Sequence, residues 1–422
     1  MTEATPPPGA YDDSRLLRAA DWVFPGGWPE RIGVAVSGGG DSMALLHLLA
    51  RNQARRGCVV HAVTVDHRLR AEAADEARTV ARFCKTLGVP HQTLVWDHGR
   101  ITQNLQDTAR RARYRLIGEW ALATGIGHVA IGHTADDQAE TFLMGLARQA
   151  GIDGLSGMRG TWDDEGIAWS RPLLRISRMT LRDYLLRNRI DWIEDPSNQN
   201  EDFTRIKARK VLGALEPLGI TVEKLTGVVH NLSSAQNALR VAACEKAVQL
   251  VRESAGELMI DRETFRQSDT ESNRRIVIGA LRWIARPPYP PRAEAIERFC
   301  ESIRTGRDAT LAGCRLKTGG ETAVIRREPS AIRSLETPTG VVWDNRWRLS
   351  GPHAPNLTVR QLGPEGLRQC PDWRSSGYSR ATLLVSPAIW RGDRLISAPL
   401  AAPDGQWTAE IVQGFHSFLL SH

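Results

Sequence analysis

The stretch I-G-V-A-V-S-G-G-G-D-S, residues 32–42, decides the fold of the first half of the chain. Its apolar start from Ile32 to Val36 predicts a short buried strand, and residues 43–49 place apolar side chains at helical spacing directly afterwards. The three glycines between strand and helix carry no side chain that would keep backbone N–H groups away from an anion. Since a helix N-terminus also attracts negative charge, the sequence predicts a phosphate-binding loop here.

Asp41 stands where a Walker-type loop would carry lysine. A carboxylate beside phosphates requires a cation between them, most simply Mg²⁺. We therefore predict that the chain binds ATP, with Mg²⁺ held by Asp41. The predicted ATP-binding residues are Ser37, Gly38, Gly39, Gly40, Asp41 and Ser42, the two serines adding hydroxyl donors. A ligand-free glycine turn is the alternative; a serine nucleophile elbow is disfavoured because Ala35 occupies its first glycine position.

Strand and helix patterns alternate up to about residue 150. Strands are predicted at 32–36, 59–65, 92–96 and 129–131, and helices at 43–49, 72–87, 102–123 and 136–147. This alternation predicts an α/β domain, a parallel sheet with helices on both faces. Such sheets bind ligands beyond the carboxyl ends of their strands, and polar residues follow three strands, at 37–42, 66–67 and 133–137.

The rest of the chain changes character. We predict a flexible tail at 1–11, a catalytic domain at 12–215, a mainly helical, basic domain at 216–334 and a small β-rich domain at 335–422. Residues 151–210 read as an irregular loop, a helix at 177–188 and a turn-rich stretch, and residues 211–255 read as helical. Residues 271–334 hold 13 Lys/Arg against seven Asp/Glu, so they form either a surface for a polyanion or an ordinary solvated face. Five tryptophans are expected in the C-terminal core, with base-stacking platforms as the alternative: Trp343, Trp347, Trp373, Trp390 and Trp407.

Composition narrows the class of protein. A chain of 422 residues with 41% hydrophobic residues is long enough for two or three domains and is not mostly disordered. The net charge of +7 favours a polyanionic partner, either nucleic acid or an anionic membrane surface. Six cysteines without a C-x-x-C pair indicate neither a disulfide scaffold nor a zinc site. We see no secretion signal and no membrane-spanning run, so we expect a cytoplasmic protein without membrane contact.

Several motifs carry a family resemblance. Residues 37–42 resemble the S-G-G-x-D-S loop of the PP-loop, or N-type, ATP pyrophosphatases, whose fold is adenine nucleotide alpha hydrolase-like. Further segments resemble the tRNA(Ile)-lysidine synthetase family: V-D-H-R-L-R at 65–70, R-R-A-R-Y at 110–114, H-T-A-D-D-Q-A-E-T at 133–141, R-P-L-L at 171–174, and E-D-P-S-N at 194–198 with F-T-R at 203–205. Arg68 stands in place of that family's glycine and Ile206 in place of its asparagine.

The resemblance implies a ligase reaction. ATP adenylates the C2 oxygen of the wobble cytidine in the CAU anticodon of tRNA(Ile), and pyrophosphate leaves. The amine of L-lysine then displaces AMP and gives lysidine, which changes the codon read from AUG to AUA and the charging identity from methionine to isoleucine. Related enzymes are often dimers, so a homodimer is an open option.

Three carboxylates lie near the start of one predicted helix. Asp136 and Glu140 are four residues apart and Asp137 and Glu140 three apart, so they share a face that can bind the amines of lysine. The alternative is that Asp136 and Asp137 only complement the helix dipole. Because free lysine is mostly protonated near neutral pH, a carboxylate or the released phosphate must accept a proton, and Asp137 is our candidate.

Cationic residues complete the predicted site. Arg113 is expected to stabilise developing charge, while Arg171, Arg205 and Arg209 are expected to contact tRNA or stabilise charge. His133 is predicted to carry a proton or contact the nucleotide, with a structural histidine as the alternative. The predicted catalytic residues are Asp41, Arg113, His133 and Asp137.

Two other functions stay open. Another PP-loop tRNA-modifying enzyme, such as a tRNA thiolase, is disfavoured because thiolases generally need a C-x-x-C pair or an active cysteine. A nucleotide-gated RNA-binding module would explain the basic segment but gives no purpose to Asp41 and the acidic helix.

Overall fold

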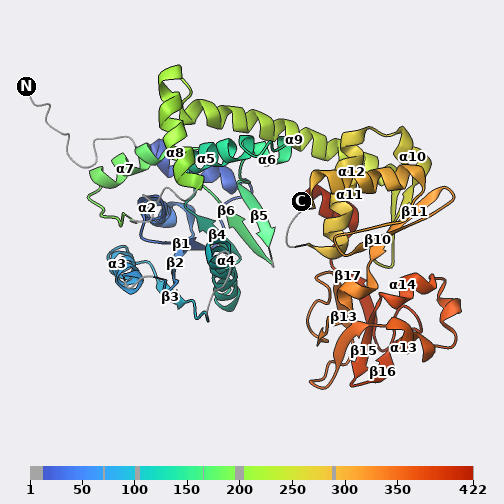
Figure 1. Cartoon of the computed structure of the whole chain (residues 1–422). Helices are drawn as coiled ribbons and strands as arrows, with labels where there is room; N and C mark the ends of the chain where they lie inside the picture. Colours follow the sequence, from blue (N-terminus) through green and yellow to red (C-terminus); the bar gives the residue numbers. More distant parts are fainter. Residues whose placement is uncertain are drawn as a thin grey trace, which may run out of the picture. The chain divides into compact units, whose positions relative to one another are not determined.

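The computed structural model describes residues 13–69, 72–99, 105–164, 166–194, 204–287 and 291–421. The chain forms two compact units, Met1–Gln236 and Asn237–His422. The boundary between them in the sequence falls within helix α9 (Val222–Leu250) (Figure 1). We predicted domain limits at 215/216 and 334/335. These limits refer to domains that fold separately, which the division into two compact units does not test, so they stay predictions. The tail predicted at 1–11 lies outside the described residues. Within the described residues, no helix combines the length and the apolar character needed to cross a bilayer.

A six-stranded sheet forms the centre of the first unit. In spatial order its strands are β3 (His91–Val95), β2 (Val59–Asp66), β1 (Arg31–Ala35), β4 (His128–Ile131), β6 (Ile167–Ser170) and β5 (Thr161–Asp164). The first five are parallel, and β5 pairs antiparallel with β6. The predicted α/β fold with a parallel sheet is therefore confirmed.

Helices cover both faces of this sheet, as Figure 1 shows. Ile32 and Val34 of β1 point to one face and are buried under α2 (Gly40–Arg56), α3 (Ala73–Thr86) and α7 (Arg178–Arg187). On the other face, Val63 and Val129 pack with Ile117 and Trp120 of α4 (Leu105–Ala123). Alternate residues of one strand face opposite sides, so a short apolar strand such as β1 serves two cores.

The prediction of an irregular loop after residue 150 is partly wrong. Beyond α5 (Ala135–Leu146) and the short α6 (Ile152–Leu155), residues 161–164 and 167–170 form β5 and β6, the two antiparallel strands of a hairpin. The hairpin buries Trp169, which stacks on Trp162 with ring centroids 5.9 Å apart. Strands of four residues are too short to show a clear alternation of apolar and polar residues, so the sequence pattern did not reveal this hairpin. The stacking of the two tryptophan rings holds its strands together.

The helical region predicted at 211–255 is interrupted, and its last residues form a strand, Val251–Ser254, instead of a helix. Helix α8 (Thr204–Leu215) ends in a short 3-10 turn, and α9 follows. Pro217 lacks the N–H that a helix interior needs, and Gly219 adopts a φ of 74° that favours glycine. These residues end α8 and let the chain turn.

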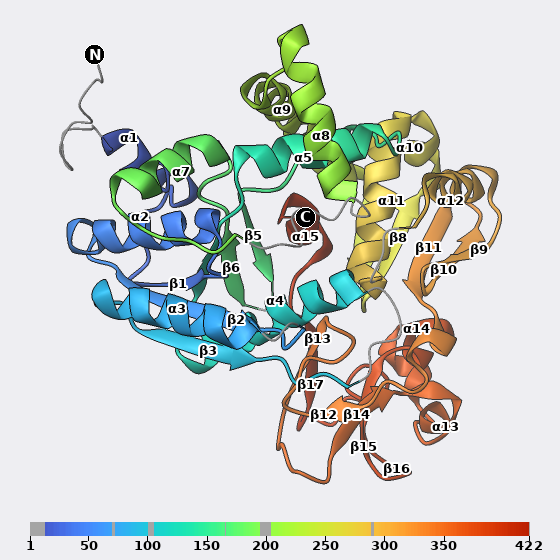
Figure 2. The same ribbon diagram turned by 60° about the vertical axis from the view of Figure 1, so that its left-hand side comes forward.

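The described residues of the second unit form three sheets, and Figure 2 shows their strands with the helices of this unit. Helices α10 (Arg262–Gln267), α11 (Thr270–Ala285) and α12 (Ala293–Thr305) accompany an antiparallel sheet of β7 (Val251–Ser254), β8 (Glu257–Asp261), β11 (Thr322–Arg327), β10 (Cys314–Gly319) and β9 (Ala309–Leu311). The C-terminal part holds β12 (Thr337–Pro338), β13 (Trp347–Ser350), β14 (Thr358–Gln361), β15 (Pro387–Arg391), β16 (Arg394–Ser397) and β17 (Thr408–Ile411), with α13 (Gly363–Arg368), α14 (Arg380–Leu384) and α15 (Phe415–Ser421). Of the five tryptophans expected in its core, four are buried and Trp373 is half-buried.

Candidate active site

The conformation of the loop after β1 is fixed by the backbone of its glycines and by the hydroxyl of Ser42. Gly38 has a φ of 87°, and α2 begins at Gly40. The Ser42 hydroxyl donates to the Gly39 carbonyl at 2.8 Å and accepts from the Ser37 amide at 3.2 Å. Ser42 therefore shapes the loop from within, whereas the exposed Ser37 is accessible to a ligand.

The amides of residues 38–41 find no acceptor within the described parts of the chain. The amides of Ser42 and Met43 are already used, since both donate to the Gly39 carbonyl. Four unpaired N–H groups at a helix N-terminus form a ready site for an anion. A Cβ on Gly38 would lie 2.7 Å from Ile193 Cδ1, so both space and φ require glycine there.

Gly132 brings the end of β4 against this loop. A Cβ at Gly132 would lie 3.1 Å from the carbonyl carbon and oxygen of Asp41 and from Ser42 Cα. These distances are shorter than an ordinary van der Waals contact, so glycine lets the end of β4, and with it α5, lie this close to the start of α2. The role of Gly132 was missed in the sequence, although it directly precedes the H-T-A-D-D segment.

The start of α5 is a capping box. The Thr134 amide and hydroxyl donate to Asp137 Oδ2 at 2.9 and 3.1 Å. Asp137 therefore caps the helix through Oδ2, while its Oδ1 accepts a hydrogen bond from Arg178. Asp136 accepts the Arg178 backbone amide at 2.6 Å, and Glu140 is fully buried.

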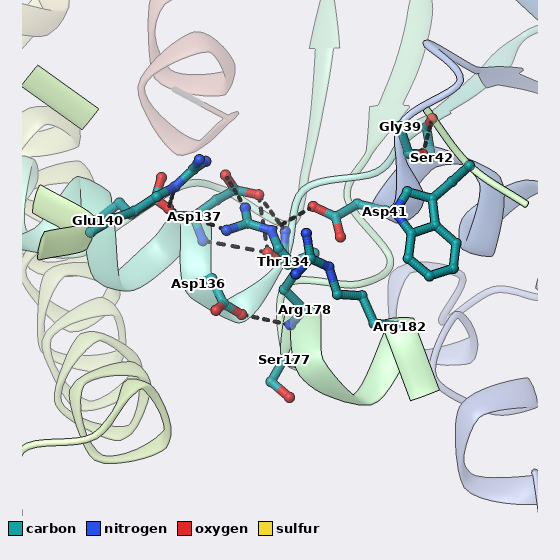
Figure 3. A network of polar contacts seen from close by, with 12 residues as sticks. Gly39, Asp41, Ser42, Thr134, Asp136, Asp137, Glu140, Ser177, Arg178 and Arg182 are labelled. Carbon is teal, nitrogen blue, oxygen red and sulfur yellow. Dashed lines mark hydrogen bonds and ion pairs between the residues drawn. The ribbon is translucent and has the colours of Figure 1, made fainter. Parts of the chain in front are cut away.

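Arg178 joins the two acidic regions (Figure 3). Its Nε lies 3.1 Å from Asp41 Oδ2, its Nη2 3.3 Å from Asp137 Oδ1 and its Nη1 3.4 Å from Glu140 Oε1. Burial alone would lower the pKa of Arg178, but these three carboxylates raise it above its ordinary value. Burial raises the pKa of Asp41, and Arg178 opposes that rise.

Arg178 was missed in the sequence. A signal was present, because it is the first residue of α7, where the helix dipole disfavours a positive charge. An arginine at that position indicates an acidic partner from elsewhere in the fold.

Helix α8 brings two predicted arginines to Glu140. Arg209 Nε lies 2.5 Å from Glu140 Oε1, and Arg205 Nε lies 3.9 Å from Oε2. Within the described residues, Oε2 is buried without a hydrogen-bond partner. Ile206, which replaces the family's asparagine, is buried.

His133 and Arg171 contact each other. Arg171 Nε donates to His133 Nδ1 at 3.1 Å, and Arg171 Nη1 donates to the Arg159 carbonyl at 2.7 Å. Burial lowers the pKa of His133, so the ring is neutral near pH 7 and Nδ1 accepts the bond. In this arrangement Arg171 orients His133.

Arg113 on α4 is half-buried, and no carboxylate pairs with it among the described residues. Burial lowers its pKa, and the neighbouring charges of Arg110 and Arg205 act in the same direction. A cation desolvated next to other cations favours an anionic ligand. Residues 195–203, which include most of E-D-P-S-N and Phe203, lie outside the described residues.

The sheet and loop define the class of protein. Residues 20–215 match a family model described as a PP-loop domain. A solved structure of the U34-tRNA thiolase NcsA from Methanococcus maripaludis covers 53% of this chain and 78% of its own at 15% identity and a TM-score of 0.46, too low to support a functional inference.

Curated relatives extend the similarity to nearly the whole chain. The tRNA(Ile)-lysidine synthase of Ruegeria pomeroyi is 44% identical over 417 residues, covering 98% of this chain and 99% of its own. That of Brucella anthropi is 34% identical and covers 92% and 89%, and that of a Wolbachia of Brugia malayi is 34% identical and covers 75% and 76%. The chain belongs to the tRNA(Ile)-lysidine synthase family.

Proposed function

We propose that this chain ligates L-lysine to C2 of the wobble cytidine in tRNA(Ile) with a CAU anticodon, through an adenylated cytidine, with ATP converted to AMP and pyrophosphate. One observation carries the proposal: the phosphate loop and the acidic start of α5 lie at the same edge of the sheet. Four unpaired amides follow β1, and Arg178 links Asp41 of that loop to the buried carboxylates of Asp137 and Glu140 on α5, which follows the neighbouring strand β4.

The loop suits a triphosphate with Mg²⁺. No cluster of His, Cys, Asp and Glu in the described residues could hold a metal alone. Mg²⁺ usually binds through one or two carboxylates together with phosphate oxygens and water, and Asp41 beside the free amides fits such a shared site. The ion would neutralise charge on the phosphates as pyrophosphate leaves.

Two observations support a lysine pocket on α5. Glu140 Oε2 is buried without a hydrogen-bond partner among the described residues, and Arg205 Nε lies 3.9 Å from it, so it can accept an ammonium donor. Burial alone would raise the pKa of Asp137, but Arg178, His133 and the Thr134 amide hold it below its ordinary value. We propose that Asp137 binds lysine as an anion and accepts its proton once the charge on Arg178 is withdrawn.

Arg113 is proposed to stabilise charge on the reacting cytidine, because no carboxylate of the described residues neutralises it. Arg171 is proposed to orient His133, which as a neutral ring contacts the nucleotide or relays a proton. Arg205 and Arg209 are proposed to stabilise charge around Glu140.

The tRNA is proposed to lie on the basic second unit. Some of the charge in residues 271–334 is used internally: Arg275 pairs with Glu271 and Lys317 with Asp308. Exposed arginines remain, at 298, 307 and 315. We also propose a cytoplasmic location, where tRNA is found, and leave a homodimer as a proposal for mass measurement in solution.

The test combines protein, ATP, Mg²⁺, a tRNA(Ile) transcript and labelled lysine, followed by mass spectrometry of the tRNA. We expect a lysine adduct on one cytidine, and none with Asp41→Asn. If the tRNA stays unmodified under conditions in which a known family member attaches lysine to it, the proposal is contradicted.

The thiolase alternative is disfavoured by the cysteines. All six are buried, and burial raises the pKa of Cys58, Cys84 and Cys300 to about 11. Such thiols form little thiolate at neutral pH. A variant with all six cysteines replaced by serine should keep lysine transfer if it folds, whereas a thiolase would lose its activity.

A further inference from the structure

Arg178 already occupies the position that a cationic substrate would take. Its guanidinium contacts Asp137 Oδ1 and Glu140 Oε1, the carboxylates proposed for lysine. The same group contacts Asp41, the residue proposed for Mg²⁺. One side chain therefore connects the metal position with the lysine pocket (Figure 3).

The backbone of Arg178 is anchored independently of its side chain. The Arg178 amide donates to Asp136 Oδ2 at 2.6 Å, and the Ser177 side chain caps α7 by accepting from Thr180 N. The side chain is 20% exposed. It can therefore change partners without unfolding the start of the helix.

The two carboxylates keep their places without Arg178. Asp137 Oδ2 is held by the Thr134 amide and hydroxyl, and Glu140 Oε1 is held by Arg209 at 2.5 Å. Removing the guanidinium would leave both carboxylates in position with one positive charge fewer. Such a site has a higher affinity for an incoming ammonium group.

We propose that Arg178 is a positioning residue that fills the lysine pocket as an internal cation until Asp41 binds Mg²⁺ with ATP, so that lysine binds after the nucleotide. When the Asp41 carboxylate turns to the metal, Arg178 loses that partner. The triphosphate beside it attracts the released guanidinium. Asp137 and Glu140 then receive the lysine ammonium in its place. This inference rests on the lysine pocket of the proposed function.

The test measures lysine binding by equilibrium dialysis, with no chemistry taking place. The probes are labelled lysine and α,β-methylene-ATP, an analogue that cannot release pyrophosphate. In the wild-type chain, the analogue with Mg²⁺ should strengthen lysine binding about tenfold or more, and the analogue with EDTA should not. By reciprocity, lysine should strengthen binding of the Mg²⁺-loaded analogue by the same factor.

Arg178→Met removes the charge and keeps much of the side-chain volume. It should bind lysine without nucleotide, so that the dependence on the analogue falls to about twofold or less. Arg178→Lys keeps a cation and should retain most of the dependence. Arg187→Met is the matched control, because Arg187 also lies on α7 and pairs with a carboxylate, Asp13, outside the site. Thermal unfolding confirms that each variant folds.

The outcomes separate the two proposals. Wild-type lysine binding that is indifferent to Mg²⁺ and the analogue would overturn the role of Arg178, and this measurement needs no variant. Unchanged nucleotide dependence in a folded Arg178→Met would do the same while leaving the lysine pocket intact. If lysine binds in no state, even with tRNA added, the proposed function fails and the inference fails with it.

Discussion

The phosphate loop and the acidic start of α5 meet at one edge of the sheet, yet they are held in opposite ways. The loop at 37–42 is shaped by backbone geometry, and its ligand groups are amides left without acceptors. The cluster around Glu140 is shaped by side-chain charge, and its carboxylates face arginines from α7 and α8. Backbone sites are prepared by the local sequence, whereas charged sites depend on partners distant in the chain.

The largest effect should come from the residue that belongs to both regions. Asp41→Ala removes the proposed metal ligand and one partner of Arg178, so pyrophosphate release should fall about 10³-fold. Affinity for ATP in EDTA should change little, since the amides remain. A variant that releases pyrophosphate at near the wild-type rate would break the assignment of Asp41.

Asp137→Asn tests the charged region alone. The amide oxygen can still accept from Thr134, so α5 keeps its cap, but the negative charge facing lysine is lost. We expect the KM for lysine to rise about 30-fold, with the KM for ATP changed less than about threefold. Steady-state kinetics with each substrate varied in turn measures both. An unaffected KM for lysine would show that the pocket is elsewhere.

Gly132→Ala tests the contact between the two regions. The new Cβ would lie 3.1 Å from backbone atoms of Asp41, so the backbone of the loop or of the strand would have to shift. We expect a loss of about 1–3 kcal/mol in the free energy of unfolding, together with weaker nucleotide binding. Gly127→Ala is the control, because a Cβ there meets nothing within 4 Å. Equal effects in denaturant titrations would refute the close approach.

The smallest effect concerns a backbone position outside the loop. Arg68 has a φ of 50°, which explains the glycine of the family pattern, and Asp66 Oδ1 accepts its amide at 2.9 Å. Arg68→Gly should relieve strain and raise the free energy of unfolding by about 0.5 kcal/mol. Arg68→Ala, which keeps the Cβ, should be neutral. A stabilising alanine would attribute the effect to the side chain instead.

The backbone features were largely predictable. The apolar run at 32–36, the glycines and the following helical spacing predicted β1, the loop and the start of α2 within a few residues, although α2 continues to Arg56, beyond the helix predicted at 43–49. Helix spacing also predicted that Asp137 and Glu140 would lie near one another, which the structure confirms through their shared contact with Arg178. These inferences needed only neighbours a few residues apart.

The charged partners were not predictable in the same way. Arg205 and Arg209 were expected to contact tRNA or developing charge, and the structure places both beside Glu140. Arg178 lies 137 residues after Asp41, and the sequence carries no period or spacing that relates them.

By itself, the sequence determined the strand–glycine–helix unit and the family to which the chain belongs, because backbone conformation depends on local residue types. Only the tertiary structure decided which cation neutralises which carboxylate and how closely Gly132 approaches the loop. Coulomb energy and steric contact depend on distances in space, and those distances exist only once the sheet and its helices have assembled.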